Sequence, residues 1–298
     1  VNAVTESVIG TECTTVKKIP VTKNVTVELG KNGLLVKWDE ADFADGYKVF
    51  KKEIGTTNWV VVGSSETTQY LDTRVSTGKT YSYKVATLGD GGIYEAENSE
   101  ASNEIIFVAL PVINSAVAYG DKITISWKKI VGAELYDVYK YNAEDEEWEL
   151  VDTVDVNTYD DYDVIGGETY GYSVVAIACD ETSLFDEEGV WVKYLSAPTG
   201  LVAENSYDGV ALSWNAVAGA DEYVVYHKVG SGTYKEIASF DATQTTYVHT
   251  GATAGQDNYY NVYARGGLTY SEASEVSIRY LSAPVIASVA VSNRNSIL

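Results

Sequence analysis

The chain has 298 residues, enough for two or three domains of ordinary size. It is 45% hydrophobic and contains 24 Tyr and 6 Trp, a composition that favours strands and allows each domain a buried core. Its formal charge is −22, from 21 basic and 43 acidic residues, so phosphate backbones and anionic membranes would repel it. No apolar run reaches the ~18 residues of a membrane span. We therefore predict no nucleic-acid partner and no direct membrane insertion.

A repeat of three copies organises the chain. The four prolines are spaced by 91, 87 and 86 residues, and a tryptophan follows each of the first three. A tyrosine comes nine residues after each tryptophan, and a glycine-led block rich in tyrosine follows later in each copy. Because three markers keep register across three copies, chance does not explain them. The markers are Pro20, Pro111, Pro198 and Pro284; Trp38, Trp127 and Trp214; Tyr47, Tyr136 and Tyr223; and the blocks 78–85, 167–174 and 255–262.

Within each copy the apolar residues alternate with polar ones. The runs 81–85, 123–127 and 136–140 all have this period of two, which places one face in a core and the other in water. Glycine-containing turn signals separate the runs, as at 30–33 and 230–232. Short strands at regular spacing, without a helical stretch, predict a Greek-key sandwich of about seven strands in each copy.

These markers resemble fibronectin type III domains. That family has a buried tryptophan on strand B, a tyrosine on strand C and a corner tyrosine at the start of strand F. The corner positions are Tyr81 and Tyr170, each six residues after a valine. In the third copy Asn258 falls at this position with Tyr259 beside it. The corner tyrosine of this copy is therefore either shifted to Tyr259 or absent. The Gly-Ala segments at 132–133 and 219–220 are similar to those in modules of secreted bacterial proteins.

The repeat and the resemblance together predict five segments in chain order. Residues 1–19 correspond to the last strand of a preceding module. Residues 20–109, 110–196 and 197–282 correspond to three complete fibronectin III-like modules, of which the second is acidic. Residues 283–298 correspond to the first strands of a following module. We therefore expect an all-β chain of tandem seven-stranded Greek-key sandwiches, three complete and partial at both ends, that belongs to a longer protein.

The negative charge is concentrated in residues 110–196, which contain 19 acidic residues and 5 lysines. Clustered carboxylates can supply the six to eight oxygen ligands that Ca²⁺ takes. Calcium is therefore the one cofactor for which the sequence offers candidate ligands. No EF-hand-like spacing supports it, and a solvated acidic surface is the alternative. The candidate ligands are Glu144, Asp145, Glu146, Glu147, Asp160, Asp161 and Asp163.

No pattern in the sequence indicates catalysis. His227 and His249 have no Cys or His partner at metal-ligand spacing, and we interpret both as solvated or half-packed side chains. The sequence contains no nucleophile elbow, no glycine-rich phosphate loop and no His-Glu-x-x-His motif. Cys13 and Cys179 are far apart in sequence and are expected to be isolated thiols. We predict that the chain is not an enzyme.

Tandem modules joined by short Leu-Ser-Ala-Pro linkers indicate a structural and interaction protein. We expect a stalk, adhesin or filament component, located outside the cell or on its surface. Its expected partners are neighbouring modules of the same chain, neighbouring copies in an assembly, and a host protein or glycan. Two alternatives stay open, namely a spacer or binding array of a large secreted polysaccharide-degrading enzyme, and a phage or virion surface protein.

Overall fold

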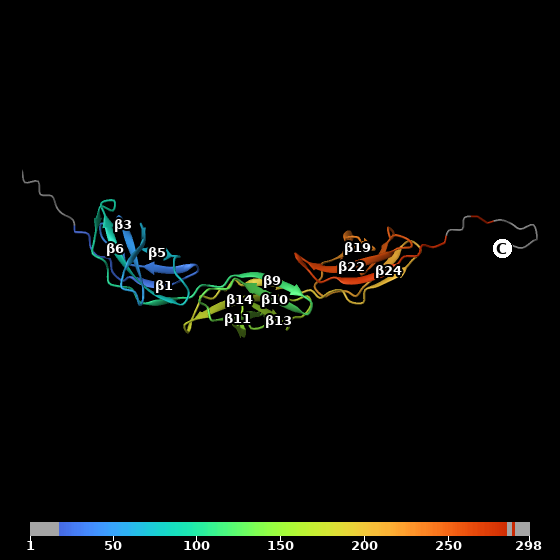
Figure 1. Ribbon diagram of the computed structural model, residues 1–298, viewed down its shortest axis with the longest axis horizontal. Coiled ribbons are helices and arrows are strands. Elements are labelled where there is room, and N and C mark those ends of the chain that lie inside the picture. The colour runs from blue at the N-terminus through green and yellow to red at the C-terminus, as the bar shows by residue number, and fades with distance from the viewer. Residues whose placement is uncertain (1–17, 285–287, 290–298) are drawn as a thin grey trace, which may run out of the picture. The chain divides into compact units, whose positions relative to one another are not determined.

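The computed structural model describes residues 18–284 and 288–289 (Figure 1). Within these ranges every regular element is a strand, and no helix of the length and hydropathy needed to cross a membrane occurs. The predicted all-β class is confirmed. The strands expected within 1–19 and 283–298 fall largely outside the described residues, as does Cys13.

Hydrogen bonding joins the described strands into six sheets, and in chain order these fall into three sets of two sheets each. The first strand set comprises β1 (Thr26–Gly30), β2 (Gly33–Lys37), β3 (Gly46–Glu53), β4 (Val60–Ser65), β5 (Gln69–Asp72), β6 (Lys79–Gly89), β7 (Tyr94–Glu95) and β8 (Ile105–Phe107). The second comprises β9 (Ile113–Tyr119), β10 (Lys122–Trp127), β11 (Leu135–Asn142), β12 (Glu147–Val154), β13 (Thr158–Asp161), β14 (Thr169–Ala178), β15 (Glu181–Thr182) and β16 (Val190–Lys193). The third comprises β17 (Val202–Asn205), β18 (Val210–Ser213), β19 (Glu222–Val229), β20 (Lys235–Asp241), β21 (Thr246–His249), β22 (Asp257–Gly266), β23 (Thr269–Tyr270) and β24 (Ser274–Arg279).

All three strand sets have the same sheet order. In the first set, β1-β2-β5 form a three-stranded sheet and β4-β3-β6-β7 a larger one, in which β8 also pairs with β6. The second set repeats this with β9-β10-β13 and β12-β11-β14-β15, and the third with β17-β18-β21 and β20-β19-β22-β23. The pairs between strands are antiparallel. Two such sheets that enclose one core form a β-sandwich.

By its internal contacts the chain divides into two compact units. The first runs to Leu110 and includes 130–134 and 176–184, and the second comprises the remaining segments from Pro111 onward. The module boundaries that the repeat predicts are not the boundaries of these units, and they stay a prediction.

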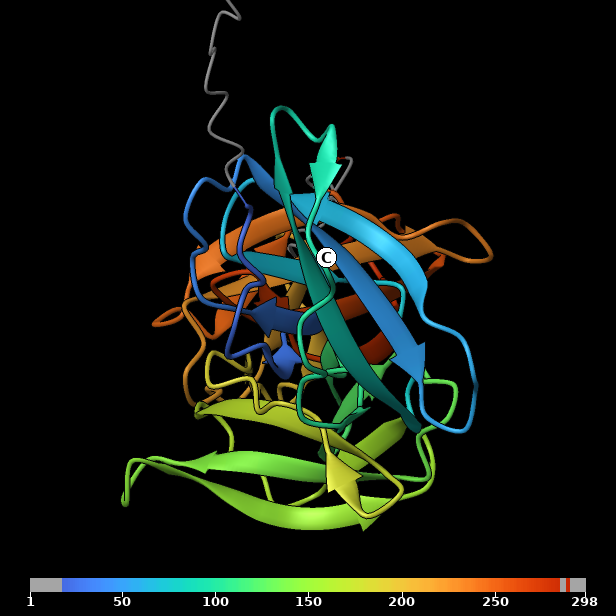
Figure 2. The same cartoon turned by 90° about the vertical axis from the view of Figure 1, so that its left-hand side faces the viewer.

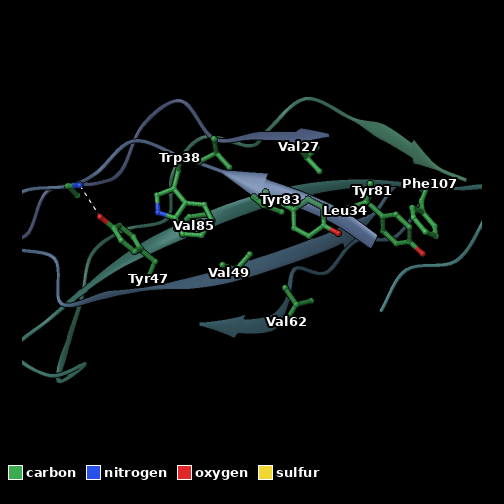
Figure 3. Close-up of a cluster of buried hydrophobic side chains, with 13 residues drawn as sticks. Val27, Leu34, Trp38, Tyr47, Val49, Val62, Tyr81, Tyr83, Val85 and Phe107 are labelled. Carbon is green, nitrogen blue, oxygen red and sulfur yellow. Dashed lines mark hydrogen bonds between the residues drawn. The ribbon is translucent and has the colours of Figure 1, made fainter. Parts of the chain in front are cut away.

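The core of the first strand set lies between its two sheets (Figure 3). Leu34 from β2 and Val49 from β3 are fully buried there. Trp38 packs edge to face against Tyr47, with 5.3 Å between ring centroids. The corresponding pairs are Trp127–Tyr136 at 5.3 Å and Trp214–Tyr223 at 5.5 Å. Because each tryptophan is at most 5% exposed, the core role predicted for the three tryptophans is confirmed.

Each strand set has eight described strands where the sequence predicts about seven, because the last strand is interrupted. A serine hydroxyl takes the place of a backbone carbonyl at the interruption. In the first set, Ser99 Oγ accepts from the backbone N–H of Val85 at 3.0 Å and donates to the carbonyl of Glu100 at 2.7 Å. Ser183 and Ser271 make the same pair of bonds in the second and third sets. The serine hydroxyl therefore accepts the hydrogen bond of a backbone N–H in the neighbouring strand, at the place where the chain bends away from that strand.

A corner tyrosine ties the start of the long strand to the preceding loop in two strand sets. The hydroxyl of Tyr81 accepts from the backbone N–H of Ser76 at 3.1 Å. The hydroxyl of Tyr170 accepts in the same way from Ile165 at 2.7 Å. Both bonds span five residues, so both positions predicted from the family resemblance are corner tyrosines in the structure.

Asn258 forms the corner of the third strand set. Its Oδ1 accepts from the backbone N–H of Thr253 at 3.0 Å, and its Nδ2 donates to the carbonyl of Thr253 at 3.1 Å. The bonds again span five residues, although the side chain is much shorter than tyrosine. The corner is therefore retained at its expected position and is not shifted to Tyr259.

Candidate functional site

A hollow of about 890 Å³ lies at one end of the first strand set, beside the segments 18–21 and 89–97. Its polar lining is mostly carboxylate, and two of these groups have structural partners. Asp45 accepts from the backbone N–H of Gly91 at 3.1 Å, and Glu95 forms an ion pair with Lys48. No histidine or cysteine is among its described lining residues.

Two strand sets contain a buried carboxylate, and a lysine and a tyrosine hold it. Asp72 is fully buried, with the ammonium group of Lys51 at 2.8 Å and the hydroxyl of Tyr83 donating at 3.0 Å. The second set repeats the arrangement as Asp161 with Lys140 at 2.8 Å and Tyr172 at 2.5 Å. Burial and the hydrogen bond to the carboxylate raise the pKa of both tyrosines far above the ordinary value. These charged groups are paired with one another inside the two sandwiches.

The three candidate calcium ligands on and after β13 have partners within the second strand set. Asp161 is the buried carboxylate just described. Asp160 pairs with Lys122 at 2.6 Å and accepts from Thr124 at 2.6 Å, and these bonds lower its pKa. The backbone N–H of Asp163 donates to Asp161 at 2.9 Å. This segment is thus part of the structural network of the sandwich.

The other candidate ligands lie on the hairpin formed by β11 and β12, whose two strands are the long green ribbons of Figure 2. Asp145 and Glu147 come together there with Glu149, and one oxygen from each lies within 4.8 Å of the others. Asn142 braces the group by donating to Asp145 at 3.0 Å and to Glu149 at 2.8 Å. Glu149 was not among the ligands predicted, although the period of two along β12 puts it beside Glu147.

No grouping of three carboxylates among the described residues includes Glu144, Glu146, Asp160, Asp161 or Asp163. The seven candidate ligands are therefore not gathered into one cluster. Calcium binding at the remaining trio stays a prediction.

His227 and His249 meet in the core of the third strand set, with 4.5 Å between ring centroids. His249 is 8% exposed, and its Nδ1 lies 2.9 Å from the hydroxyl of Tyr260. His227 Nε2 lies 2.9 Å from Oδ1 of Asn258. Burial, with a smaller contribution from His227, lowers the pKa of His249 to about 4. The interpretation of His249 as a solvated or half-packed side chain is therefore wrong.

The histidine pair occupies the positions of the lysine–aspartate pair in the other two sets. His249 precedes its tyrosine partner Tyr260 by eleven residues, as Asp72 and Asp161 precede theirs. His227 is four residues after the strand-C tyrosine, as Lys51 and Lys140 are. Aligning the three copies at these two spacings would have revealed the pair, whereas a search for metal-ligand spacing could not.

Five aromatic side chains cover the outer face of the larger sheet in the second strand set. Cross-strand pairing places Tyr141 opposite Trp148 and Tyr139 opposite Leu150. Ring centroids in contact are 5.1–5.7 Å apart for the edge-to-face pairs and 6.2 Å apart for the two tryptophans. Trp191 is 50% exposed and Leu150 is 54% exposed, so the surface is open to solvent. We call this surface the aromatic face, and it consists of Tyr139, Tyr141, Trp148, Phe185 and Trp191.

Two glycines let these rings lie close against the backbone. A Cβ at Gly171 would approach the ring of Trp191 to 2.9 Å, and a Cβ at Gly189 would approach Trp148 to 2.4 Å. Gly189 also has φ +57°, a conformation that other residues adopt at a cost. The indole N–H of Trp191 donates to the carbonyl of Glu188 at 3.0 Å. The aromatic face is therefore held in place before any partner binds.

The observations that decide the fold type are the repeated sheet order, the buried tryptophan–tyrosine pairs and the corner residues. These features agree with those that the resemblance to fibronectin type III domains implies for a β-sandwich. No family model and no curated protein matches the sequence.

Three of the solved structures with partial likeness to the chain are of chicken proteins. The CNTN1 FN1–FN3 domains share 14% identity at a TM-score of 0.33, over 88% of this chain and 99% of that one. The interferon gamma receptor alpha chain shares 14% identity at a TM-score of 0.41, over 59% and 99%. A two-domain fibronectin type III segment of tenascin shares 16% identity at a TM-score of 0.34, over 57% and 97%.

Proposed function

We propose that this chain is a non-catalytic structural and interaction segment of a longer extracellular protein, such as a stalk, an adhesin or a filament component. The observation that supports this role best is the aromatic face, a preorganised apolar surface on a rigid sheet. Exposed tryptophan on such a surface is typical of binding sites, because large rigid rings bury much area at little entropic cost. The buried ionic groups have structural partners, which leaves binding as the chemistry that the surface offers.

The extracellular location has a direct test. Antibodies raised against the chain should label intact cells, or the medium around them, in a culture of the organism that produces it. Labelling that requires permeabilised cells would contradict the proposal.

The interaction role has a separate test in an array of purified extracellular proteins and glycans. The chain should bind at least one member, and Trp191→Ala should weaken that binding about tenfold, the change that loss of one good contact produces. Tyr207→Ala is the matched control, because Tyr207 is 84% exposed and lies outside the aromatic face. Equal binding by the two variants would show that the aromatic face has no part in the interaction.

The aromatic face also favours one second candidate, the binding array of a secreted polysaccharide-degrading enzyme. Flat aromatic rings can pack against the apolar faces of sugar rings. If glycans are the only array members that bind, and Trp191→Ala abolishes their binding, this second role is the better description.

A further inference from the structure

In the first and third strand sets, lysines of the chain itself lie over aromatic rings. In the first set, Lys84 Nζ lies 5.2 Å from the ring centroid of Trp59. In the third, Lys228 Nζ lies 4.4 Å from the centroid of Tyr234 and 5.0 Å from that of Tyr259. A cation over the face of an aromatic ring is attracted by the negative charge of that face. The chain therefore uses its own lysines to satisfy these rings.

The second strand set has an aromatic residue where the others have lysine. Five residues after the strand-C tyrosine stand Lys52, Tyr141 and Lys228 in the three copies. Tyr141 packs edge to face against both tryptophans of the aromatic face, at 5.4 Å and 5.2 Å. No lysine or arginine of the part of the chain that the structure describes lies over the five rings of the aromatic face.

The surroundings of the aromatic face are strongly acidic. Along β12, Glu147 and Glu149 flank Trp148, and both are exposed. The loop that carries Phe185 continues with the exposed Glu187 and Glu188. Strands β11 and β12 together contain one lysine, Lys140, and its ammonium group is held by Asp161. A cation that approached the aromatic face would meet favourable potential from the carboxylates of the loop at Phe185.

The edge of the sheet suits an extended partner. β12 is the outermost strand of its sheet, eight residues long, and no other described strand pairs with its outer side. Its free backbone groups can accept a further strand from a partner. Alternate side chains of such a strand would lie on the same side of the sheet as Trp148 and Leu150.

We propose that the aromatic face, with the edge of β12, binds an extended lysine- or arginine-rich segment of a partner polypeptide. This inference rests on the interaction role proposed above and specifies the chemistry of the partner. The cationic side chains would lie over the rings of the aromatic face, as the chain's own lysines lie over Trp59, Tyr234 and Tyr259. Backbone pairing along β12 would hold the segment in register.

The test is a titration of the whole chain with the peptide Arg-Thr-Arg-Thr-Arg-Thr, followed by calorimetry and by tryptophan fluorescence. The expected result is saturable binding that the peptide Gln-Thr-Gln-Thr-Gln-Thr does not show. Trp191→Ala should weaken binding about tenfold, because one ring that attracts cations is lost. Tyr141→Lys should weaken it at least as much, since it supplies the cation from within the chain. Tyr141→Phe should retain binding and shows that the surface tolerates substitution.

The charge-matched control is Tyr207→Lys, which adds the same charge at an exposed residue of the third strand set. It should change affinity less than about twofold at an ionic strength of ~0.15 M, where distant charges are screened. Equal weakening by Tyr141→Lys and Tyr207→Lys would mean that the peptide responds only to net charge, which overturns the inference.

Three further outcomes would also overturn it. The first is binding of a neutral hexasaccharide, and not of the arginine peptide, at the aromatic face. The second is self-association of the chain that Trp191→Ala abolishes, which would make a second copy the occupant. The third is the absence of arginine-peptide binding by the folded wild-type chain. The first two leave the interaction role intact, and the antibody labelling decides the extracellular location independently of all three.

Discussion

His227 and His249 come from opposite sheets of the third strand set and place their rings 4.5 Å apart in its core. They replace a lysine and an aspartate that form a buried ion pair in the other two sets. The rings lie beside Tyr260, Tyr247 and Asn258. Protonation of His249 would place a charge there with little water around it.

We predict that the third strand set loses stability in mild acid. Burial lowers the pKa of His249 from 6.5 to about 4 in the folded state, so the unfolded state takes up a proton first as the pH falls. The stability from neutral His249 is therefore complete above about pH 6.5 and is lost as the pH falls toward 4. The loss should be roughly 2–3 kcal/mol between pH 7 and pH 4. Hydrogen exchange of the β19 and β22 amides measures it.

The matched control for the histidine pair is the double variant His227→Lys with His249→Asp, which recreates the pair of the other sets. This variant should show a smaller loss of β19 and β22 protection over the same pH range. A pH profile that is identical in the two proteins would show that the histidines do not cause the acid sensitivity.

A second prediction concerns the buried ion pair of the second strand set. Lys140→Met should destabilise this set by about 3–5 kcal/mol, because it leaves the buried charge of Asp161 without its partner. Lys122→Met removes the more exposed pair with Asp160, 26% and 37% exposed, and should cost less than about 1 kcal/mol. Urea denaturation, combined with hydrogen exchange of the β10 and β11 amides, measures the loss of unfolding free energy in each variant. Similar costs for the two variants would contradict the structural role assigned to Asp161.

A third prediction concerns the asparagine corner. Asn258→Ala should destabilise the third strand set by about 1–3 kcal/mol, because it removes the hydrogen bonds that the fully buried Asn258 side chain makes to the backbone of Thr253 and Gln256. Tyr259→Phe should have an effect below about 0.5 kcal/mol, the usual range for a surface change. The reverse order of the two effects in a denaturation experiment would place the corner at Tyr259 instead.

A fourth prediction tests calcium at the hairpin. If Asp145, Glu147 and Glu149 bind Ca²⁺ in the folded state, its concentration should raise the melting midpoint logarithmically. Melting is compared in millimolar Ca²⁺ and in EDTA at matched ionic strength. The double variant Glu147→Gln with Glu149→Gln should melt at the same temperature in both. A wild-type midpoint that does not respond to Ca²⁺ would leave the trio as ordinary acidic surface.

The sequence by itself determined the scaffold. Alternating apolar residues, the spacing of the tryptophans and the corner positions fixed the strands, the core and the register of the repeat, because these features depend on local period and on which side chains must be buried. Trp38, Trp127 and Trp214 are buried as predicted. Asn258 departs from tyrosine at the corner position in the sequence itself, but its hydrogen bonds to Thr253 are visible only in the structure.

Only the tertiary structure decided which distant side chains meet. His227 and His249 lie on strands of different sheets, and no short-range spacing joins them. In the sequence Asp160 and Asp161 belong to an acidic run, and such a run does not show which of its members point inward. The structure pairs them with Lys122 and Lys140. The aromatic face combines rings from β11, β12, β16 and the loop at Phe185, and each ring by itself is an ordinary strand or loop residue. The packing of the strands against one another makes them one surface.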